Sequence, residues 1–584
     1  MAKRIAVRAK PGARAHGPWT GQYDPGVPVE LEYPDAALHE LLDDAAESHP
    51  DATATIFFGR RRTYRALHRD VVRFAGGLRK LGVRPGDRVA IMLPNCPQFL
   101  IAFYATLRIG AVVVPCNPLY TPREIAHQLA DAGAETIVVL SRIYPVIRAV
   151  RADTPLRNVI VTNIKEEMPS VTRLLFTLAK EKKDGHRQAF AGDPGAIAFP
   201  ALLRGGGDEA AAPVRPADLA VLQYTGGTTG VPKAAMLSHR ALLANTLQCR
   251  AWFGNLTDGR ETMMAVMPLF HVYGLTTVMN MGVQAAAALI LEPQFDLGRV
   301  LADTQKFRPK LFHGAPRIYN AIVNAPDAAK YDLRSIEACI SGSAPLMVET
   351  ARKFKALTGG NLVEGYGLTE ASPVTHCNPV LTDTLNRIGT IGLAFPDTET
   401  RIVDLATGER DVAPGEAGEL IIRGPQLMDG YYGMPDETAK TLRKGWLYTG
   451  DVATMDADGY VSIVDRKKEL IIVSGFNVYP REVEEQLARH PAVVESAAIG
   501  VPHPIKGEEV KAFVVRTPGA MVTVEELIAF CREGLAPFKV PKAIEFRDTL
   551  PKTLIGKVLR RQLADEDAKT RAPSETGVGA APLG

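Results

Sequence analysis

The sequence predicts an α/β fold in which a large N-terminal domain of doubly wound α/β subdomains and a small β-barrel precedes a small α+β C-terminal domain. The 584 residues exceed the roughly 250–300 residues that one hydrophobic core usually organises. Apolar strand-like runs alternate with helical patterns across residues 63–140, which is typical of parallel sheets with right-handed crossovers. Short β-type runs separated by turns occupy residues 389–424 and indicate a small β-barrel or a β-rich subdomain.

The first alternating units can be followed element by element. Apolar residues recur at helical spacing from Thr63, and Gly82 follows as a glycine suited to end a helix. A capping box with proline at the first helical position, from Thr121 to Glu124, marks another helix start. The predicted segments are a helix over 63–81, a strand over 88–93, a helix over 98–109, a strand over 111–114 and a strand over 136–140.

Residues 164–196 interrupt this alternation. Four apolar residues share one side of a predicted helix: Val171, Leu174, Leu175 and Leu178. Three lysines follow within residues 180–183, so the helix is basic and amphipathic. We expect it to lie against its own domain; a helix that lies on a membrane surface is the alternative.

An uncharged stretch of twenty residues, 272–291, has the length of a membrane span. It also contains Asn280, Gln284, two threonines and two glycines. A buried helix followed by a strand over 287–291 explains the stretch better.

A charged segment at 465–468 suggests a domain boundary. A compact α+β pattern follows, with a helix that opens at Pro480, a helix capped by Thr523 with Glu526, and strands over 470–473, 496–500, 511–515 and near Ile544. The predicted divisions are a frayed basic arm over 1–34, a large adenylation domain over 35–465, a small domain over 466–568 and a disordered tail over 569–584.

Composition narrows the function classes. The net charge of +3 gives no support to a nucleic-acid partner. The six cysteines contain no Cys-x-x-Cys pair, which argues against a metal knuckle or a disulfide framework and favours a reducing compartment. The basic N-terminus lacks the apolar core of a signal peptide. We therefore expect a cytoplasmic protein.

A stretch rich in glycine and threonine follows the apolar run at 219–222. Residues 225–233 contain three glycines, three threonines and Lys233. Closely spaced backbone N–H groups and hydroxyls form a cradle for polyphosphate, to which the lysine adds a cation. Val231 and Pro232 separate the last glycine from the lysine, so this is not an ordinary P-loop. A simple surface turn is the alternative.

Five motifs, in order, resemble those of the adenylate-forming superfamily of acyl- and aryl-CoA ligases, luciferases and adenylation domains. They are residues 225–233, 365–370, 448–451, 465–468 and 551–557. Each motif is weak alone, but together they span about residues 35–565. Residues 445–451, 458–460 and 473–480 look most like those of bacterial long-chain fatty acyl-CoA synthetases.

The resemblance implies an ATP site in the large domain. Adenylation brings a carboxylate against the α-phosphate, so cations and polar groups must converge there. The implied phosphate and magnesium residues are Thr225, Gly226, Gly227, Thr228, Thr229, Gly230 and Lys233 for the β- and γ-phosphates, Thr369 for the α-phosphate and Glu370 for Mg²⁺. The implied nucleoside residues are Asp451 and Arg466 for ribose, and Tyr366, Gly367, Ser343, Ala344 and Pro345 for adenine. Many relatives carry glycine where this chain has Ser343.

The resemblance also implies a mobile small domain. Lys557 would bridge the carboxylate and the α-phosphate during adenylation. The domain would then rotate about Lys468 to build the thiolation site, where Ser474, Gly475 and Phe476 let pantetheine pass. At the acyl end, His271 and Gly342 would border the pocket for the acid. For each of these residues an ordinary structural role is the alternative.

We therefore expect a long-chain fatty acid–CoA ligase that uses ATP, Mg²⁺ and CoA. The alternatives are a ligase for medium-chain, aromatic or terpenoid acids, a fatty acyl-AMP ligase that loads a carrier protein, and a bioluminescent oxygenase. A silent nucleotide-binding protein should have lost Lys557 or Glu370, and both are present. Peripheral membrane contact and a homodimer stay open at this point.

Overall fold

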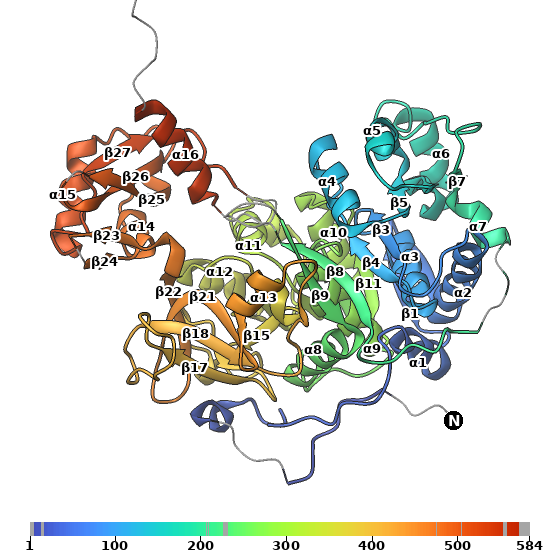
Figure 1. Ribbon diagram of the computed structural model, residues 1–584, viewed down its shortest axis with the longest axis horizontal. Coiled ribbons are helices and arrows are strands. Elements are labelled where there is room, and N and C mark those ends of the chain that lie inside the picture. Colours follow the sequence, from blue (N-terminus) through green and yellow to red (C-terminus); the bar gives the residue numbers. More distant parts are fainter. Residues whose placement is uncertain are drawn as a thin grey trace, which may run out of the picture.

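The computed structural model describes residues 5–12, 17–205, 207, 210–225, 232–474, 476–503, 505–552 and 558–571. A large body holds the two largest sheets, and the last strands and helices form a small unit at one side of it (Figure 1). Helices α5 and α6 lie at the opposite side of the body (Figure 1). This arrangement confirms the expected α/β class with a large N-terminal and a smaller C-terminal part.

An eight-stranded sheet has the order β19-β9-β8-β4-β3-β5-β6-β7. Its strands are β3 (Arg88–Met92), β4 (Val112–Pro115), β5 (Thr136–Leu140), β6 (Asn158–Thr162), β7 (Ala196–Ala198), β8 (Leu219–Thr225), β9 (Lys233–Ser238) and β19 (Gly430–Tyr431). Strands β3 to β8 pair in parallel, whereas β9 pairs antiparallel with both β8 and β19. The alternation read from the sequence therefore does produce a parallel sheet.

A nine-stranded sheet has the order β16-β15-β14-β13-β12-β10-β11-β1-β2. Its strands are β1 (Thr53–Phe57), β2 (Arg60–Thr63), β10 (Thr262–Ala265), β11 (Ala288–Leu291), β12 (Leu311–Phe312), β13 (Ala338–Ser341), β14 (Asn361–Gly367), β15 (Val374–Cys377) and β16 (Leu393–Ala394). The six strands from β14 to β1 pair in parallel, and antiparallel pairs close both edges.

The helices of the large body are α1 (Glu40–Ser48), α2 (Tyr64–Lys80), α3 (Pro97–Arg108), α4 (Pro122–Ala132), α5 (Tyr144–Val150), α6 (Ser170–Ala179), α7 (Phe199–Gly205), α8 (His239–Trp252), α9 (Met281–Gln284), α10 (Leu297–Phe307), α11 (Pro316–Val323), α12 (Val348–Thr358) and α13 (Pro435–Thr441). Their ends follow the local signals of the sequence. Thr63 caps α2, and Gly82 follows that helix with a φ of 91° that suits glycine. The capping box of Thr121 and Glu124 is formed.

A β-rich part of the large body follows the two large sheets in the chain and precedes the small unit. Its strands are β17 (Glu399–Val403), β18 (Gly418–Arg423), β20 (Leu442–Arg443), β21 (Trp446–Met455) and β22 (Val461–Arg466). They pair in the order β17-β18-β21-β20, with β22 on β21. Among the described strands, β21 pairs with three partners and no pairing joins β17 to β20 or β22. This part is therefore an open β-rich subdomain, the second of the two expected forms, and not a closed barrel.

The small unit has the predicted α+β elements. They are β23 (Ile471–Val473), β24 (Phe476–Val478), α14 (Pro480–Ala488), β25 (Val493–His503), β26 (Gly507–Arg516), α15 (Val524–Gly534), β27 (Ala543–Phe546) and α16 (Arg560–Arg571). Its two hydrophobic clusters, within residues 471–563, are separate from the cluster of the large body, which runs from Ile5 to Val461. The domain limits at 34/35 and 465/466 stay predictions.

The N-terminal arm is not frayed where the structure describes it, which corrects that expectation. Ile5, Trp19 and Leu31 are buried. Asp24 accepts hydrogen bonds from three successive backbone N–H groups at 380–382. Apolar contacts and this buried carboxylate hold the arm on the body. Of the predicted disordered tail, residues 569–571 end α16 and the rest lie outside the described residues.

The two unusual segments behave differently from each other. Residues 272–291 are buried and form a π-helix (Gly274–Asn280), α9 and β11, as expected. Helix α6 contains no buried residue, so the expectation that its apolar side lies against its own domain is wrong. Among the described residues, no helix is long and apolar enough to cross a membrane.

Candidate active site

The ends of the predicted phosphate loop meet at the end of the eight-stranded sheet. Thr225 closes β8 and pairs with Lys233, the first residue of β9. The Thr225 hydroxyl donates to the Lys233 carbonyl over 3.3 Å. The loop residues between them that were assigned to phosphate binding, from Gly226 to Gly230, lie outside the described residues. The antiparallel pair therefore holds the two ends of the loop together.

Lys233 contacts two residues that the sequence reasoning missed. Its ammonium group pairs with the Glu437 carboxylate on α13 and lies over the Tyr431 ring, 5.1 Å from the centroid. Lys233 and then Lys440 lower the pKa of Glu437 to about 2. Because Glu437 lies about 200 positions from Lys233, no local sequence signal could have revealed the pair.

Tyr431 connects this cation to the predicted magnesium carboxylate. Its hydroxyl donates to Glu370 Oε1 over 2.7 Å. Burial, followed by the charge of Glu370, raises the pKa of Tyr431, so the phenol stays protonated and acts as a donor. Lys233, Tyr431 and Glu370 therefore form one connected group at the edge of the sheet.

The turn that carries Thr369 and Glu370 is fixed by its backbone. It is a 3-10 turn (Thr369–Ala371) directly after β14. A Cβ on Gly367 would lie 2.1 Å from the Pro373 carbonyl oxygen, so this close approach requires glycine. The Glu370 carbonyl accepts from Met428 N–H over 2.8 Å.

A cavity of about 290 Å³ opens beside this turn. It is lined by Leu368, Glu370, Glu419, Tyr431, Lys440, Thr441, Arg443, Tyr448, Thr449, Gly450 and Lys467. The three cations of this lining outnumber its two carboxylates, and Lys467 pairs with Glu419 over 2.8 Å. Such a polar, partly cationic hollow suits a phosphate-rich ligand better than an alkyl chain.

The predicted ribose and adenine residues meet around Asp451. Strands β21 and β22 place Asp451 opposite Arg466, and the two side chains pair over 3.2 Å. The Tyr366 hydroxyl on β14 donates to the same carboxylate. Asp451 is only 7% exposed, so two donors from different strands fix its direction.

Ser343 in the predicted adenine loop has a backbone conformation that favours glycine. Ser343, half-buried after β13, has a φ of 76°, a left-handed conformation that costs a side-chain residue roughly 1–2 kcal/mol. Ala344 and Pro345 continue the loop toward α12. Gly342 packs against Tyr273, since a Cβ there would lie 3.1 Å from that ring.

His271 lies half-buried just before the π-helix. Burial lowers its pKa to about 4, so the ring is neutral near neutral pH. Its Nδ1 accepts from the Tyr273 backbone N–H over 3.3 Å. The ring proton therefore sits on Nε2, which can donate to an acceptor such as a carboxylate.

The small unit joins the body through a short polar connection. Lys468 lies in a 3-10 turn (Lys467–Glu469) after β22. Arg481 at the start of α14 donates to the Asp465 carboxylate and to the Ile463 carbonyl, each over 2.8 Å.

Beyond this connection lie the residues predicted to contact CoA. Ser474 has a φ of 52° and donates its N–H to the Lys506 carbonyl. Phe476 is 57% exposed and stacks on Phe538. Gly475 and Lys557 lie outside the described residues, so their predicted roles are untested.

Two protein-family models match the sequence of this chain. The family model for "AMP-binding enzyme" matches residues 42–432, and the model for "AMP-binding enzyme C-terminal domain" matches residues 482–557. The chain belongs to the AMP-binding enzyme family. This confirms the adenylate-forming resemblance inferred from the five motifs.

Named relatives can be aligned with this sequence over almost the whole chain. The chain is 44% identical to a long-chain-fatty-acid–CoA ligase of Bacillus subtilis and 41% identical to one of Yersinia pestis, in each case over 94% of this chain and 98% of the relative. ATP-bound MatB from Rhodopseudomonas palustris has a TM-score of 0.80 at 31% identity, with 91% of this chain and 99% of that chain covered. The anthranilate CoA ligase AuaEII in complex with anthranoyl-AMP also has a TM-score of 0.80, at 27% identity over 92% of this chain and 99% of that chain.

Proposed function

We propose that this chain is a long-chain fatty acid–CoA ligase. It activates a fatty acid with ATP to an acyl-adenylate, releases pyrophosphate, and transfers the acyl group to CoA with release of AMP. The observation that carries the proposal is the convergence of Lys233, Tyr431 and Glu370 beside the cationic cavity. The names of the two long-chain-fatty-acid–CoA ligases described above support a fatty acid and CoA as the substrates.

The ATP site is assembled from groups that neutralise and orient charge. Lys233 and the loop before it hold the β- and γ-phosphates, and the Thr369 hydroxyl contacts the α-phosphate. Asp451, which already accepts from Tyr366 and Arg466, uses its remaining lone pairs for the ribose hydroxyls. Fixed donors and cations at the α-phosphate favour the transition state, in which negative charge builds up.

Glu370 suits a magnesium site of the kind that ATP-dependent enzymes use. Among the described residues, no three His, Cys, Asp or Glu side chains converge, so an all-protein metal cage is not present there. Mg²⁺ commonly takes one or two carboxylates and completes its shell with phosphate oxygens and water. Glu370 would supply the carboxylate, and the ion would supply charge neutralisation for the phosphates.

The acid and the thiol approach from the other side of the α-phosphate. The neutral His271, with its proton on Nε2, can donate to the carboxylate of the acid without adding charge. Gly342 and Tyr273 border the same end. Lys557 completes the adenylation site, after which rotation about Lys468 presents Ser474, Gly475 and Phe476 to CoA.

A second candidate is a CoA ligase for aromatic acids. The chain is 37% identical to a feruloyl-CoA synthase of an Amycolatopsis species over 89% of its length. Medium-chain or terpenoid acids, and a carrier protein in place of CoA, remain alternatives of the same chemistry. We place the enzyme in the cytoplasm, with peripheral access to lipid; a homodimer stays a prediction.

The test is an assay of the purified protein with ATP, Mg²⁺ and CoA across acetate, octanoate, palmitate, oleate and benzoate, with AMP and acyl-CoA quantified together. We expect preferred conversion of palmitate or oleate to the thioester. Preferred conversion of benzoate would support the aromatic candidate. AMP or bound acyl-adenylate without thioester would contradict CoA as the acceptor.

A further inference from the structure

Helix α6 presents an apolar surface that nothing in the described chain covers. Its four large aliphatic side chains share one side of the helix: Val171 is 71% exposed, Leu174 60%, Leu175 61% and Leu178 77%. An amphipathic helix normally turns this side to its own core. An exposed cluster of this kind marks a contact with something else.

The side of α6 opposite these four residues holds the helix on the protein. The Arg173 guanidinium donates to the carbonyls of Lys165 and Glu166, over 3.1 and 2.9 Å. The Phe176 ring, on the inner side, meets His186 edge-on. The helix is therefore fixed with its apolar side outward.

The chain after α6 repeats this attachment and adds positive charge. Glu181 is buried and accepts from Lys165 and Asn163. The surrounding cations are exposed: Lys180, Lys182, Lys183 and Arg187. Asp184 is the one exposed acid within residues 180–187. Since the buried acid Glu181 is already paired, four exposed cations stand against one exposed carboxylate, and the surface of this stretch is net positive.

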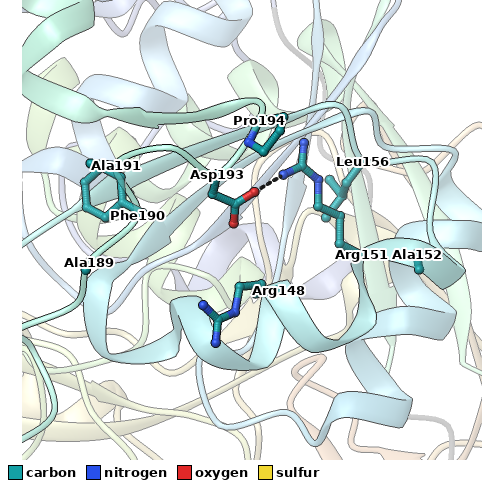
Figure 2. Close-up of a pocket in the computed structure, with 9 residues that line it drawn as sticks. All are labelled: Arg148, Arg151, Ala152, Leu156, Ala189, Phe190, Ala191, Asp193 and Pro194. Carbon is teal, nitrogen blue, oxygen red and sulfur yellow. Dashed lines mark hydrogen bonds and ion pairs between the residues drawn. The ribbon is translucent and has the colours of Figure 1, made fainter.

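The surface belongs to a lobe at the far side of the molecule from the small unit (Figure 1). His186 contacts both Phe176 of α6 and Ser141 just before α5, so the two helices form one lobe. A hollow of about 740 Å³ lies beside α5. It is lined by Arg148, Arg151, Ala152, Leu156, Ala189, Phe190, Ala191, Asp193 and Pro194, whose side chains are drawn in Figure 2. This hollow is not part of the apolar and basic surface formed by α6 and residues 180–187, because Arg151 is already paired with Asp193.

We propose that α6 docks on an anionic lipid surface, with Val171, Leu174, Leu175 and Leu178 at the boundary between headgroups and acyl chains. Lys180, Lys182 and Lys183 then meet the anionic headgroups. A second copy of this chain would bring the same positive charges face to face, which disfavours a dimer through α6. The purpose of this docking, which is access to acids dissolved in the membrane, rests on the proposed function. The binding of α6 to lipid does not rest on it.

The experiment is flotation of the full-length protein, without substrates, on vesicles of phosphatidylcholine with or without phosphatidylglycerol, at low and high salt. We expect binding to the anionic vesicles at low salt. The combined variant Leu174→Ser, Leu175→Ser, Leu178→Ser should bind at least about 10-fold more weakly. The combined variant Lys180→Gln, Lys182→Gln, Lys183→Gln should lose mainly the dependence on anionic lipid.

Met521→Ser is the matched control, because Met521 is 95% exposed on the small unit; it should bind as the parent protein does. The proposal is overturned if the parent protein does not float at low salt, or if the leucine variant floats equally well. It is also overturned if light scattering shows a dimer that only the leucine variant loses. Turnover of octanoate in vesicle-free buffer should be unchanged in the leucine variant. Because this assay needs no lipid and the flotation needs no substrate, failure of the proposed ligase function can be distinguished from failure of the proposed docking.

Discussion

Lys233 and Glu437 form an ion pair that neutralises both side chains. In the proposed ATP site the phosphates would replace this carboxylate at Lys233, so we expect the ion pair to compete with the nucleotide. Both side chains are about one-third exposed (27% and 35%), and ion pairs as exposed as this one are weak. We therefore expect the competition with ATP to be small.

Glu437→Gln should lower the KM for ATP, by up to about 5-fold, because the competing charge is removed. Initial rates of pyrophosphate release against ATP concentration measure this. Asp436→Asn, one residue away on α13, removes the same charge and should leave KM near its original value. A rise in KM for Glu437→Gln would mean that the carboxylate positions Lys233 for catalysis.

Asp451→Asn should raise the KM for ATP on the order of 10- to 100-fold. A carboxylate that binds hydroxyls through charge-assisted hydrogen bonds contributes about 1.5–3 kcal/mol. Tyr366→Phe removes only one donor to Asp451 and should raise KM by a few-fold. Direct ATP binding by calorimetry checks both variants. Equal affinity of Asp451→Asn and the parent protein would exclude the ribose role.

At the scale of elements, the sequence predicted best those features that depend on interactions between residues a few positions apart. The capping boxes at Thr121 and Thr523 are both formed, because each needs only residues three positions apart. Whether the β-type runs close into a barrel could not be predicted in this way. Closure requires β17 to pair with a strand at the other edge of the sheet. That depends on how the whole β-rich segment bends, and the alternation of residues within one strand carries no information about it.

Thr523→Ala should destabilise the small unit by about 1 kcal/mol, because the Glu526 N–H loses its acceptor. Hydrogen exchange of amides in α15, followed by mass spectrometry, measures the loss locally. Thr523→Ser keeps the hydroxyl and should exchange close to the parent rate. If alanine and serine variants exchanged alike, the cap would have no measurable role.

At the scale of the whole molecule, the hydrophobic core of the large body is separate from the two hydrophobic clusters of the small unit. Among the described residues, polar contacts near Asp465 and Arg481 join the two parts. Few crossing contacts make relative motion of two units the default expectation. This agrees with the proposal that one ATP site serves two half-reactions through two positions of the small domain.

Lys557→Ala should slow adenylation by on the order of 10²-fold or more, yet leave thioester formation from preformed acyl-adenylate. The two half-reactions can be measured separately, by pyrophosphate release and by acyl-CoA formation from synthetic adenylate. Lys552→Ala removes a nearby lysine that pairs with Glu495 and should leave both rates near the parent values. An equal loss of both halves in Lys557→Ala would contradict the two-position mechanism.

The sequence by itself determined the alternating elements, the helix ends and the set of motifs, because these depend on spacing within a few residues and on residue type. Only the tertiary structure decided which groups meet. It joined Glu437 and Tyr431 to the phosphate-loop lysine, packed the N-terminal arm onto the body, left the β-rich part open and turned the apolar side of α6 outward. Each of these depends on contacts between distant segments, about which hydrophobic periodicity carries no information.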